Sequence, residues 1–148
     1  MRHLIQSLVT KEIEFSVPGK PVGKPRMTRS DTWKARPSVL RYRAWADVAR
    51  LCLAEAGGLP DGFEAIGIEM TAYIKMASSW PKKKRTELGG TIHQQKPDAD
   101  NLLKCADALF KEDKGIVYTA AVKFWLPDGD TNERLDIRLL FRNAQNGG

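Results

Sequence analysis

Three carboxylates and a lysine gather within a short stretch of this chain, at Asp98, Asp100, Lys104 and Asp113. Carboxylate oxygens are the ligands that Mg²⁺ prefers, and the ion keeps several waters when it binds them. A lysine beside such a site can meet a phosphate as a point charge. These residue types therefore indicate phosphodiester chemistry.

A helix is expected to begin at the first of these acids and to span about residues 98–110. Pro97 precedes the pattern, and Asp is a favoured residue at a helix N-cap and in the first turn. Asp100 and Lys104 then lie four residues apart on one face of that helix. A metal bound there would explain why carboxylates that repel one another converge.

The same stretch also fits an ordinary charged stripe on a solvated helix. The charges alternate in sign at a spacing of three or four residues, at Asp100, Lys104, Asp107 and Lys111. Spacing alone leaves both interpretations open. The crowding of Asp98 and Asp100 favours the metal site. One acid in the first turn is enough for a favourable interaction with the helix dipole, and Asp113 lies beyond the expected end of the helix, where the dipole does not stabilise an acid.

The positive charge of the chain is concentrated in two segments. The 148 residues carry a formal net charge of +6. Residues 18–37 contain six Lys or Arg against Asp31, and residues 77–97 contain five against Glu87, so the rest of the chain sums to −3. A merely soluble surface would spread its charge more evenly, so nucleic acid is the expected partner. The candidates for contact with DNA are Lys24, Arg26, Lys83 and Arg85.

The length of the chain indicates a single domain, residues 1–148, with a core that needs no disulfide. Cys52 and Cys105 are isolated in apolar helical patterns and are expected as buried, reduced thiols. No signal peptide opens the chain, and no apolar run approaches a membrane span. We expect a cytoplasmic protein that uses no small-molecule cofactor.

Hydrophobic periodicity predicts the elements that must position these residues. Alternation of apolar and polar residues predicts strands over about residues 12–17, 66–76, 115–126 and 134–141. The second of these strands is expected to pair centrally. Spacings of three and four residues predict a helix over about 39–56, before the one at 98–110. The order is β-α-β-α-β-β, which indicates a two-layer α+β domain with two helices packed on a mixed or mostly antiparallel sheet.

Three aromatic side chains and a histidine are assigned structural roles. Tyr42 and Trp45 lie on the apolar side of the first expected helix and are predicted in the core. Trp80 begins the second basic segment, which is expected as a loop, and is predicted to anchor it rather than to stack on a base. His93 lies in a polar loop, where we expect it in solvent and assign it no ligand role.

Three stretches follow one another in an order that resembles a known family. Residues 21–26 come after the first strand and have the sequence Pro-Val-Gly-Lys-Pro-Arg. Residues 96–104 contain D-x-D-N-L-x-K, followed by D-A-L at 107–109. Residues 113–116 precede a strand that contains Lys-Phe-Trp at 123–125. Together these motifs resemble the RusA-like Holliday junction resolvases, small endodeoxyribonucleases found in bacteria and especially in prophages.

The resemblance implies a magnesium-dependent endonuclease that cuts four-way DNA junctions as a homodimer, in DNA recombination and repair. Residue by residue it assigns Asp98, Asp100 and Asp113 to Mg²⁺ and adds Lys104 as a catalytic lysine. The third acidic motif of the family is often an Asp-Asp pair. Here it is Glu112-Asp113 after a short spacer, so Glu112 competes with Asp113 for that role.

Two other functions fit the same residues. The chain could be a non-catalytic, structure-selective DNA-binding module, in which the acids hold a structural cation or only cap the helix. It could also be a nuclease for other branched DNA, such as flaps. Cleavage with and without Mg²⁺ separates the first alternative, and matched junction, fork and duplex substrates separate the second.

Overall fold

The computed structural model describes residues 2–32, 36–110 and 114–144. Within these residues, four strands form one sheet in the order β1-β4-β2-β3. The strands are β1 (Lys11–Pro18), β2 (Phe63–Ile74), β3 (Tyr118–Trp125) and β4 (Arg134–Asn143). β4 is antiparallel to β1 and to β2, whereas β3 pairs parallel to β2. The predicted α+β class, the mixed sheet and the central place of the second strand are confirmed.

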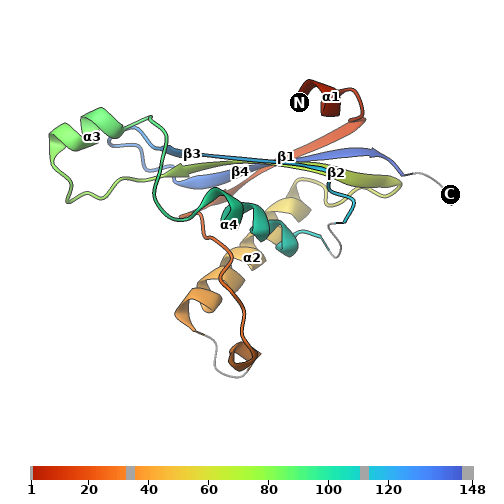
Figure 1. Ribbon diagram of the computed structural model, residues 1–148, viewed down its shortest axis with the longest axis horizontal. Coiled ribbons are helices and arrows are strands. Elements are labelled where there is room, and N and C mark those ends of the chain that lie inside the picture. Colours follow the sequence, from red (N-terminus) through yellow and green to blue (C-terminus); the bar gives the residue numbers. More distant parts are fainter. Residues whose placement is uncertain (1, 33–35, 111–113, 145–148) are drawn as a thin grey trace.

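The longer helices cover one face of the sheet. Figure 1 views the sheet almost edge-on, with α2 (Pro37–Glu55) and α4 (Ala99–Lys104) below it and α1 (Arg2–Gln6) on the opposite side. α3 (Lys82–Leu88) lies at the left end of the sheet. Two short 3₁₀ helices, η1 (Arg29–Thr32) and η2 (Cys105–Ala108), precede α2 and follow α4. None of the described helices is long and apolar enough to cross a membrane.

The core lies between the sheet and the helices α2 and α4. Alternate residues of the strands point into it, so that Val17, Leu135 and Leu139 are fully buried. Tyr42 and Trp45 of α2 are also buried, which confirms their predicted place. A fully buried aliphatic or aromatic side chain contributes roughly 1.5–3 kcal/mol. The side chains that fasten α4 to this core are Leu102 and Cys105, which are completely buried.

Two expectations about the helices were wrong. The helix expected over 98–110 is shorter, because its α-helical part ends at Lys104 and continues as the tighter η2, as often happens at a helix C-terminus. The second basic segment was expected as a loop, yet residues 82–88 form α3. α3 buries none of its side chains, so it produces no hydrophobic period. α1 was not predicted either.

Candidate active site

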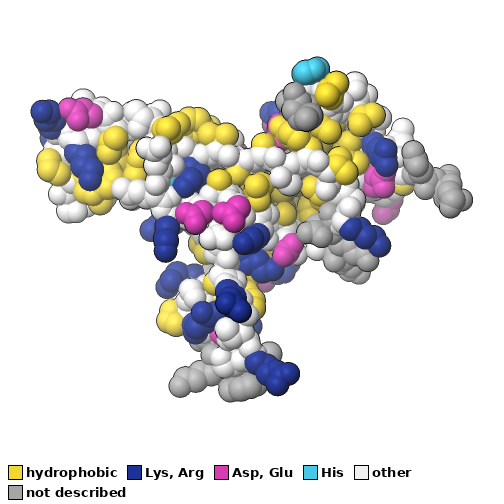
Figure 2. All heavy atoms as spheres, viewed as in Figure 1, with side chains coloured by type: hydrophobic (Ala, Val, Ile, Leu, Met, Phe, Trp, Pro, Cys, Tyr) yellow, Lys and Arg dark blue, Asp and Glu magenta, His cyan; other side chains and the backbone are white. Residues whose placement is uncertain are grey.

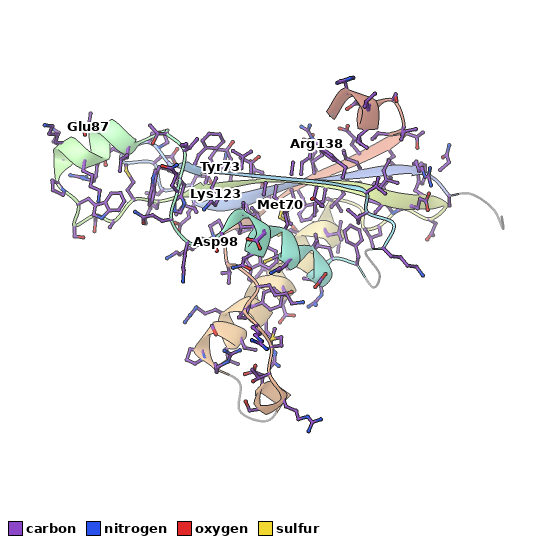
Figure 3. The ribbon with its side chains drawn as sticks, in the orientation of Figure 1. Met70, Tyr73, Glu87, Asp98, Lys123 and Arg138 are labelled. Carbon is purple, nitrogen blue, oxygen red and sulfur yellow. The ribbon has the colours of Figure 1, made fainter. Side chains whose placement is uncertain are left out.

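The start of α4 leaves two of the predicted carboxylates at the surface. Asp98 occupies the N-cap position with an extended backbone, φ −67° and ψ 151°, but its side chain makes no capping hydrogen bond. Figure 3 labels Asp98 at this point of the ribbon. Asp100 lies in the first turn, and its side chain is 73% exposed. Because a capping Asp would spend an oxygen on a backbone N–H of the first turn, the carboxylate of Asp98 is left for another partner.

Lys104 lies beside these acids, as its spacing predicts. Its Nζ is 3.6 Å from Oδ2 of Asp100 and donates to Oδ1 of Asn101 at 3.5 Å. The side chain of Lys104 is 59% exposed, and an exposed pair four residues apart on a helix contributes only about 0.3–0.5 kcal/mol. The ammonium can therefore exchange these partners for a phosphate at little cost.

The first basic segment packs directly against α4. A Cβ added to Gly23 would lie 3.1 Å from Cβ of Asn101 and 3.2 Å from Cβ of Pro97, so the chain passes too close for a larger residue. The backbone N–H of Lys24 donates to the carbonyl of Asn101 at 3.2 Å. The thiol of Cys105 donates to the carbonyl of Val22 at 2.9 Å. These contacts bring the loop to the acidic helix.

The side chain of Lys24 is tied to the same helix. Its Nζ lies 2.6 Å from Oδ2 of Asp107, and this hydrogen bond raises the pKa of Lys24 above its ordinary value. Next to the pair is a groove of about 580 Å³. Its lining side chains carry three cations and one acid, and consist of Lys24, Pro25, Arg26, Met27, Asn101, Lys104 and Asp107. The groove therefore has a net positive charge next to the exposed carboxylates.

The second basic segment is held at the other side of the site. The ring of Trp80 packs edge-on against Trp125 with centroids 5.0 Å apart, and Nζ of Lys84 lies 3.7 Å above the Trp80 ring. The predicted anchoring role of Trp80 fits this packing. Arg85 is half-buried and bonds to Asp128 and to the carbonyl of Trp80, both at 3.1 Å. Lys83 on the same helix is exposed.

His93 is not in solvent as expected. It is 4% exposed, and its ring centroid lies 4.1 Å from that of Trp125. Burial lowers the pKa of His93, and the nearby charge of Lys123 lowers that pKa further. The expectation was wrong because Trp125, which comes from β3, covers a residue that is remote in sequence.

The two basic segments and the acidic helix start surround one corner of the molecule. In Figure 2 the outline is hollowed between the arm that carries α3 and the arm that carries η1 and the start of α2. Lys and Arg side chains gather over both arms, and acidic side chains lie over α4 between them. This arrangement offers positive charge to a polyanion on both sides of the carboxylates.

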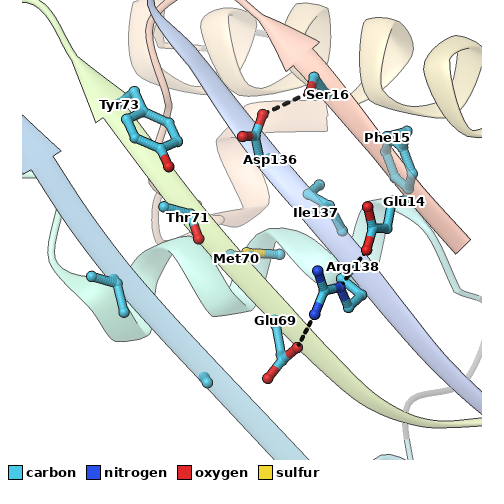
Figure 4. A pocket seen from close by; sticks show the side chains of 12 residues that line it. Glu14, Phe15, Ser16, Glu69, Met70, Thr71, Tyr73, Asp136, Ile137 and Arg138 are labelled. Carbon is cyan, nitrogen blue, oxygen red and sulfur yellow. Dashed lines mark hydrogen bonds and ion pairs between the residues drawn. The ribbon is translucent and has the colours of Figure 1, made fainter. Parts of the chain in front are cut away.

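The opposite face of the sheet has a different electrostatic character. It is hollowed by about 560 Å³, and Figure 4 shows Arg138 there between Glu14 and Glu69. The guanidinium lies 2.6 Å from Glu14 and 3.5 Å from Glu69, and Ser16 donates to Asp136 at 2.6 Å. Arg134 and Arg138 on this face are paired with acids, so they offer less charge to a polyanion than unpaired cations would.

A comparison with protein families agrees with the motifs in the chain. The family described as endodeoxyribonuclease RusA matches residues 18–139, which include both basic segments, α4 and β3. The chain belongs to the RusA endodeoxyribonuclease family. This RusA-family protein is accordingly an endodeoxyribonuclease, a hydrolase of DNA phosphodiester bonds. A search of curated proteins finds no match to the chain.

The structure describes some, but not all, of the residues predicted to form the site of this RusA-family chain. Asp98, Asp100 and Lys104 lie together, with Lys24 and Arg26 in the adjoining groove. Asp113 and its competitor Glu112 lie outside the described residues. Within the described part of the chain no group of three His, Cys, Asp or Glu side chains is arranged to hold a metal. Sequence reasoning gave no role to Lys123, although it belongs to one of the family motifs.

Proposed function

We propose that this endodeoxyribonuclease is magnesium-dependent and resolves four-way (Holliday) DNA junctions in recombination and repair. The observation that supports this best is that the carboxylate of Asp98 makes no capping hydrogen bond. It lies beside the exposed Asp100, at the corner between two basic arms. A carboxylate with a structural role would be bonded to the helix backbone. Exposed acids surrounded by phosphate-binding charge suit a metal-assisted nuclease better.

The donor set at the start of α4 fits Mg²⁺. The ion commonly takes one or two protein carboxylates and fills its other positions with waters and substrate phosphates. Asp98 and Asp100 supply that number, with Asp113 or Glu112 proposed as the further acid. When bound, Mg²⁺ supplies charge that polarises the phosphoryl oxygens and activates water for hydrolysis.

The side chains of the protein supply the rest of the proposed mechanism. Water is the nucleophile that attacks the phosphorus, the bond from phosphorus to one sugar oxygen breaks, and that oxygen leaves as a hydroxyl group after taking up a proton. The ammonium of Lys104 neutralises the charge that grows on the phosphate, or orients the water, and it is free to do so because its pairing with Asp100 is exposed and weak. Lys24 and Arg26 in the groove bind the flanking phosphates and fix the DNA relative to the acids.

DNA is proposed to lie against the helix-covered face, across the two basic arms. Most of the contacts are expected with the phosphate backbone, which positions the protein without reading the sequence. Arg26 and Lys83 are the leading contacts, and Lys24 is a candidate whose bond to Asp107 would have to be shared with a phosphate. Arg85 remains a candidate, but its bonds to Asp128 and the Trp80 carbonyl would have to be shared with a phosphate.

A homodimer is the proposed active assembly. A four-way junction must be cut on two strands to give two duplexes, and two identical sites related by a two-fold axis make that pair of cuts naturally. The alternatives of a monomer that nicks once or a nuclease for flaps do not require this symmetry. We also propose a cytoplasmic location, because the DNA it acts on lies there, and no small-molecule cofactor.

The test is cleavage of a synthetic four-way junction, with matched fork and duplex substrates, with and without Mg²⁺. We expect symmetric paired cuts in the junction only when Mg²⁺ is present, and a dimer in sedimentation at micromolar concentration. Asp100→Asn removes one ligand and should reduce cleavage by about 10²- to 10³-fold while junction binding is retained. Asp47→Asn, an exposed acid on α2 that pairs with Arg50, is the matched control.

Four outcomes would contradict the proposal. Full cleavage by Asp100→Asn would remove that residue from the site. Junction binding without cleavage under any metal condition would favour the non-catalytic module. Equal or faster cutting of forks would favour a nuclease for other branched DNA, and a monomer with full resolving activity would exclude the dimer.

A further inference from the structure

The segment that leads into α4 is fastened to the edge of the sheet. β3 is an edge strand, and residues 90–93 run along its free side. The N–H of Trp125 donates to the carbonyl of Thr91 at 2.8 Å. The N–H of His93 donates to the carbonyl of Lys123 at 2.9 Å. Up to His93, the backbone of β3 therefore determines the path of this segment.

Beyond His93 the segment is bonded to the side chain of Lys123 instead of to the backbone of β3. Nζ of Lys123 donates to the carbonyl of Gln95 at 2.6 Å and to the carbonyl of Pro97 at 2.8 Å. The Pro97 carbonyl belongs to the peptide group that joins Pro97 to Asp98. One ammonium thus holds the peptide that immediately precedes the first acid of the site (Figure 3).

The two hydrogen bonds of Lys123 hold the turn before Asp98 in position, in addition to satisfying two carbonyl acceptors. Gln95 is exposed, so water could bond to its carbonyl in place of a lysine, whereas the bond to the carbonyl of the half-buried Pro97 is partly shielded. The lysine connects both carbonyls to a strand that is itself paired to β2. On its other side Pro97 is met by the first basic segment at Gly23. The peptide before Asp98 is therefore held from two directions.

Lys123 has no acidic partner among the residues that the structure describes. Both of its hydrogen bonds there are to backbone carbonyls. An ammonium has three N–H donors, and two of them are directed at the turn. The charge of Lys123 also acts on its neighbour His93, whose pKa it lowers. The lysine therefore bonds to the backbone next to the site and does not form a surface ion pair with the described residues.

We propose that Lys123 is a positioning residue for the nuclease site, which holds the carboxylate of Asp98 in place through the carbonyls of Gln95 and Pro97. The inference rests on the proposed function of Asp98 as a metal ligand. Groups that orient a metal ligand commonly affect metal affinity or activity by about 10- to 100-fold when they are removed. A misplacement of about 1 Å at a reacting group has an effect of similar size.

The test compares three lysine variants. Lys123→Met removes the ammonium and keeps the length of the side chain, whereas Lys123→Arg keeps donors for the two carbonyls. Lys11→Met is the control, because Lys11 lies on β1, where its charge sits 5.3 Å from the centre of the Phe63 ring. Each variant is measured for single-turnover cleavage over a range of Mg²⁺ concentrations, for junction binding in EDTA, and for amide exchange at Leu102 without metal, because the Leu102 N–H donates to the Asp98 carbonyl at 3.1 Å.

For Lys123→Met we expect the cleavage rate at saturating junction to fall by about 10- to 100-fold and the Mg²⁺ requirement to rise by about tenfold. Junction binding in EDTA should change by less than about threefold, because the lysine is not proposed to touch DNA. The amide of Leu102 should exchange faster in Lys123→Met, while Lys11→Met matches the wild type. Lys123→Arg should recover most of the rate.

Two results would overturn the inference. Unchanged amide exchange at Leu102 together with an unchanged Mg²⁺ requirement would show that the bonds to Gln95 and Pro97 do not position the acid. A loss of junction binding in EDTA as large as the loss of rate would make Lys123 a DNA contact instead. If Lys123→Met does not fold, Lys123→Gln carries the same measurements. If the wild type cuts no DNA, the proposed function fails, while the exchange data still decide whether Lys123 holds Asp98.

Discussion

At the scale of single residues, Asp98 distinguishes a capping acid from a functional one. An ordinary Asp N-cap stabilises a helix by about 0.5–2 kcal/mol through its bond to the first turn, but Asp98 makes no such bond. We therefore predict that Asp98→Ala, which removes any capping oxygen, leaves the Tm of the metal-free protein unchanged to within about 1 °C. Asp31→Asn, which loses bonds that do exist, serves as the positive control in the same thermal scans. A clear drop in Tm for Asp98→Ala would return Asp98 to the capping role.

The residues that sequence could identify are those whose partners are close in sequence. Asp98, Asp100 and Lys104 share one helix turn or its neighbour, so their spacing was enough to group them. The partners of His93 and Lys123 are Trp125 and Pro97, which lie 26 or more residues away. No periodicity within one segment can reveal such contacts, because they exist only after the segment 90–97 has paired with β3.

At the scale of elements, hydrophobic period predicted every described strand and the helix α2, because each of them buries one side. It failed for α3, where no side chain is fully buried and helix formation follows from the propensity of Lys, Arg and Leu after Pro81. The strand order could not be derived either. β4 enters between β1 and β2, and this choice depends on which faces the helices cover.

The first basic segment is shaped by one buried carboxylate, and this gives a prediction about pH. Asp31 is 3% exposed, and the Arg36 guanidinium together with the N–H of Thr28 holds the pKa of its carboxyl well below the usual range. A depressed pKa stabilises the fold above the unfolded-state value of about 4, and this stabilisation is lost as the pH falls further. Asp31→Asn should therefore lower the Tm at pH 7, and the gap to the wild type should narrow below about pH 4. Thermal unfolding at pH 7, 5 and 3 checks this, and a gap that stays constant with pH would contradict it.

At the scale of the whole molecule, the sheet separates the side proposed to bind DNA from a side on which Arg138 and Arg142 are paired with acids. The exposed Lys83 belongs to the first side. Arg142 forms an ion pair with Glu64, across β4 and β2, away from the acidic corner. The two residues carry the same charge, so replacing either by Gln changes the net charge of the protein equally. Any difference between the variants in DNA binding therefore reports where the DNA lies.

The salt dependence of binding measures that difference. A protein that neutralises one phosphate fewer loses about 0.9 from the slope of log affinity against log salt concentration on duplex DNA. We predict that Lys83→Gln reduces the slope for a four-way junction by about 1, whereas Arg142→Gln leaves it unchanged. Titrations in EDTA over roughly 50–200 mM salt provide the measurement. Equal reductions would mean that only net charge matters, and a reduction confined to Arg142→Gln would place the DNA on the opposite face of the sheet.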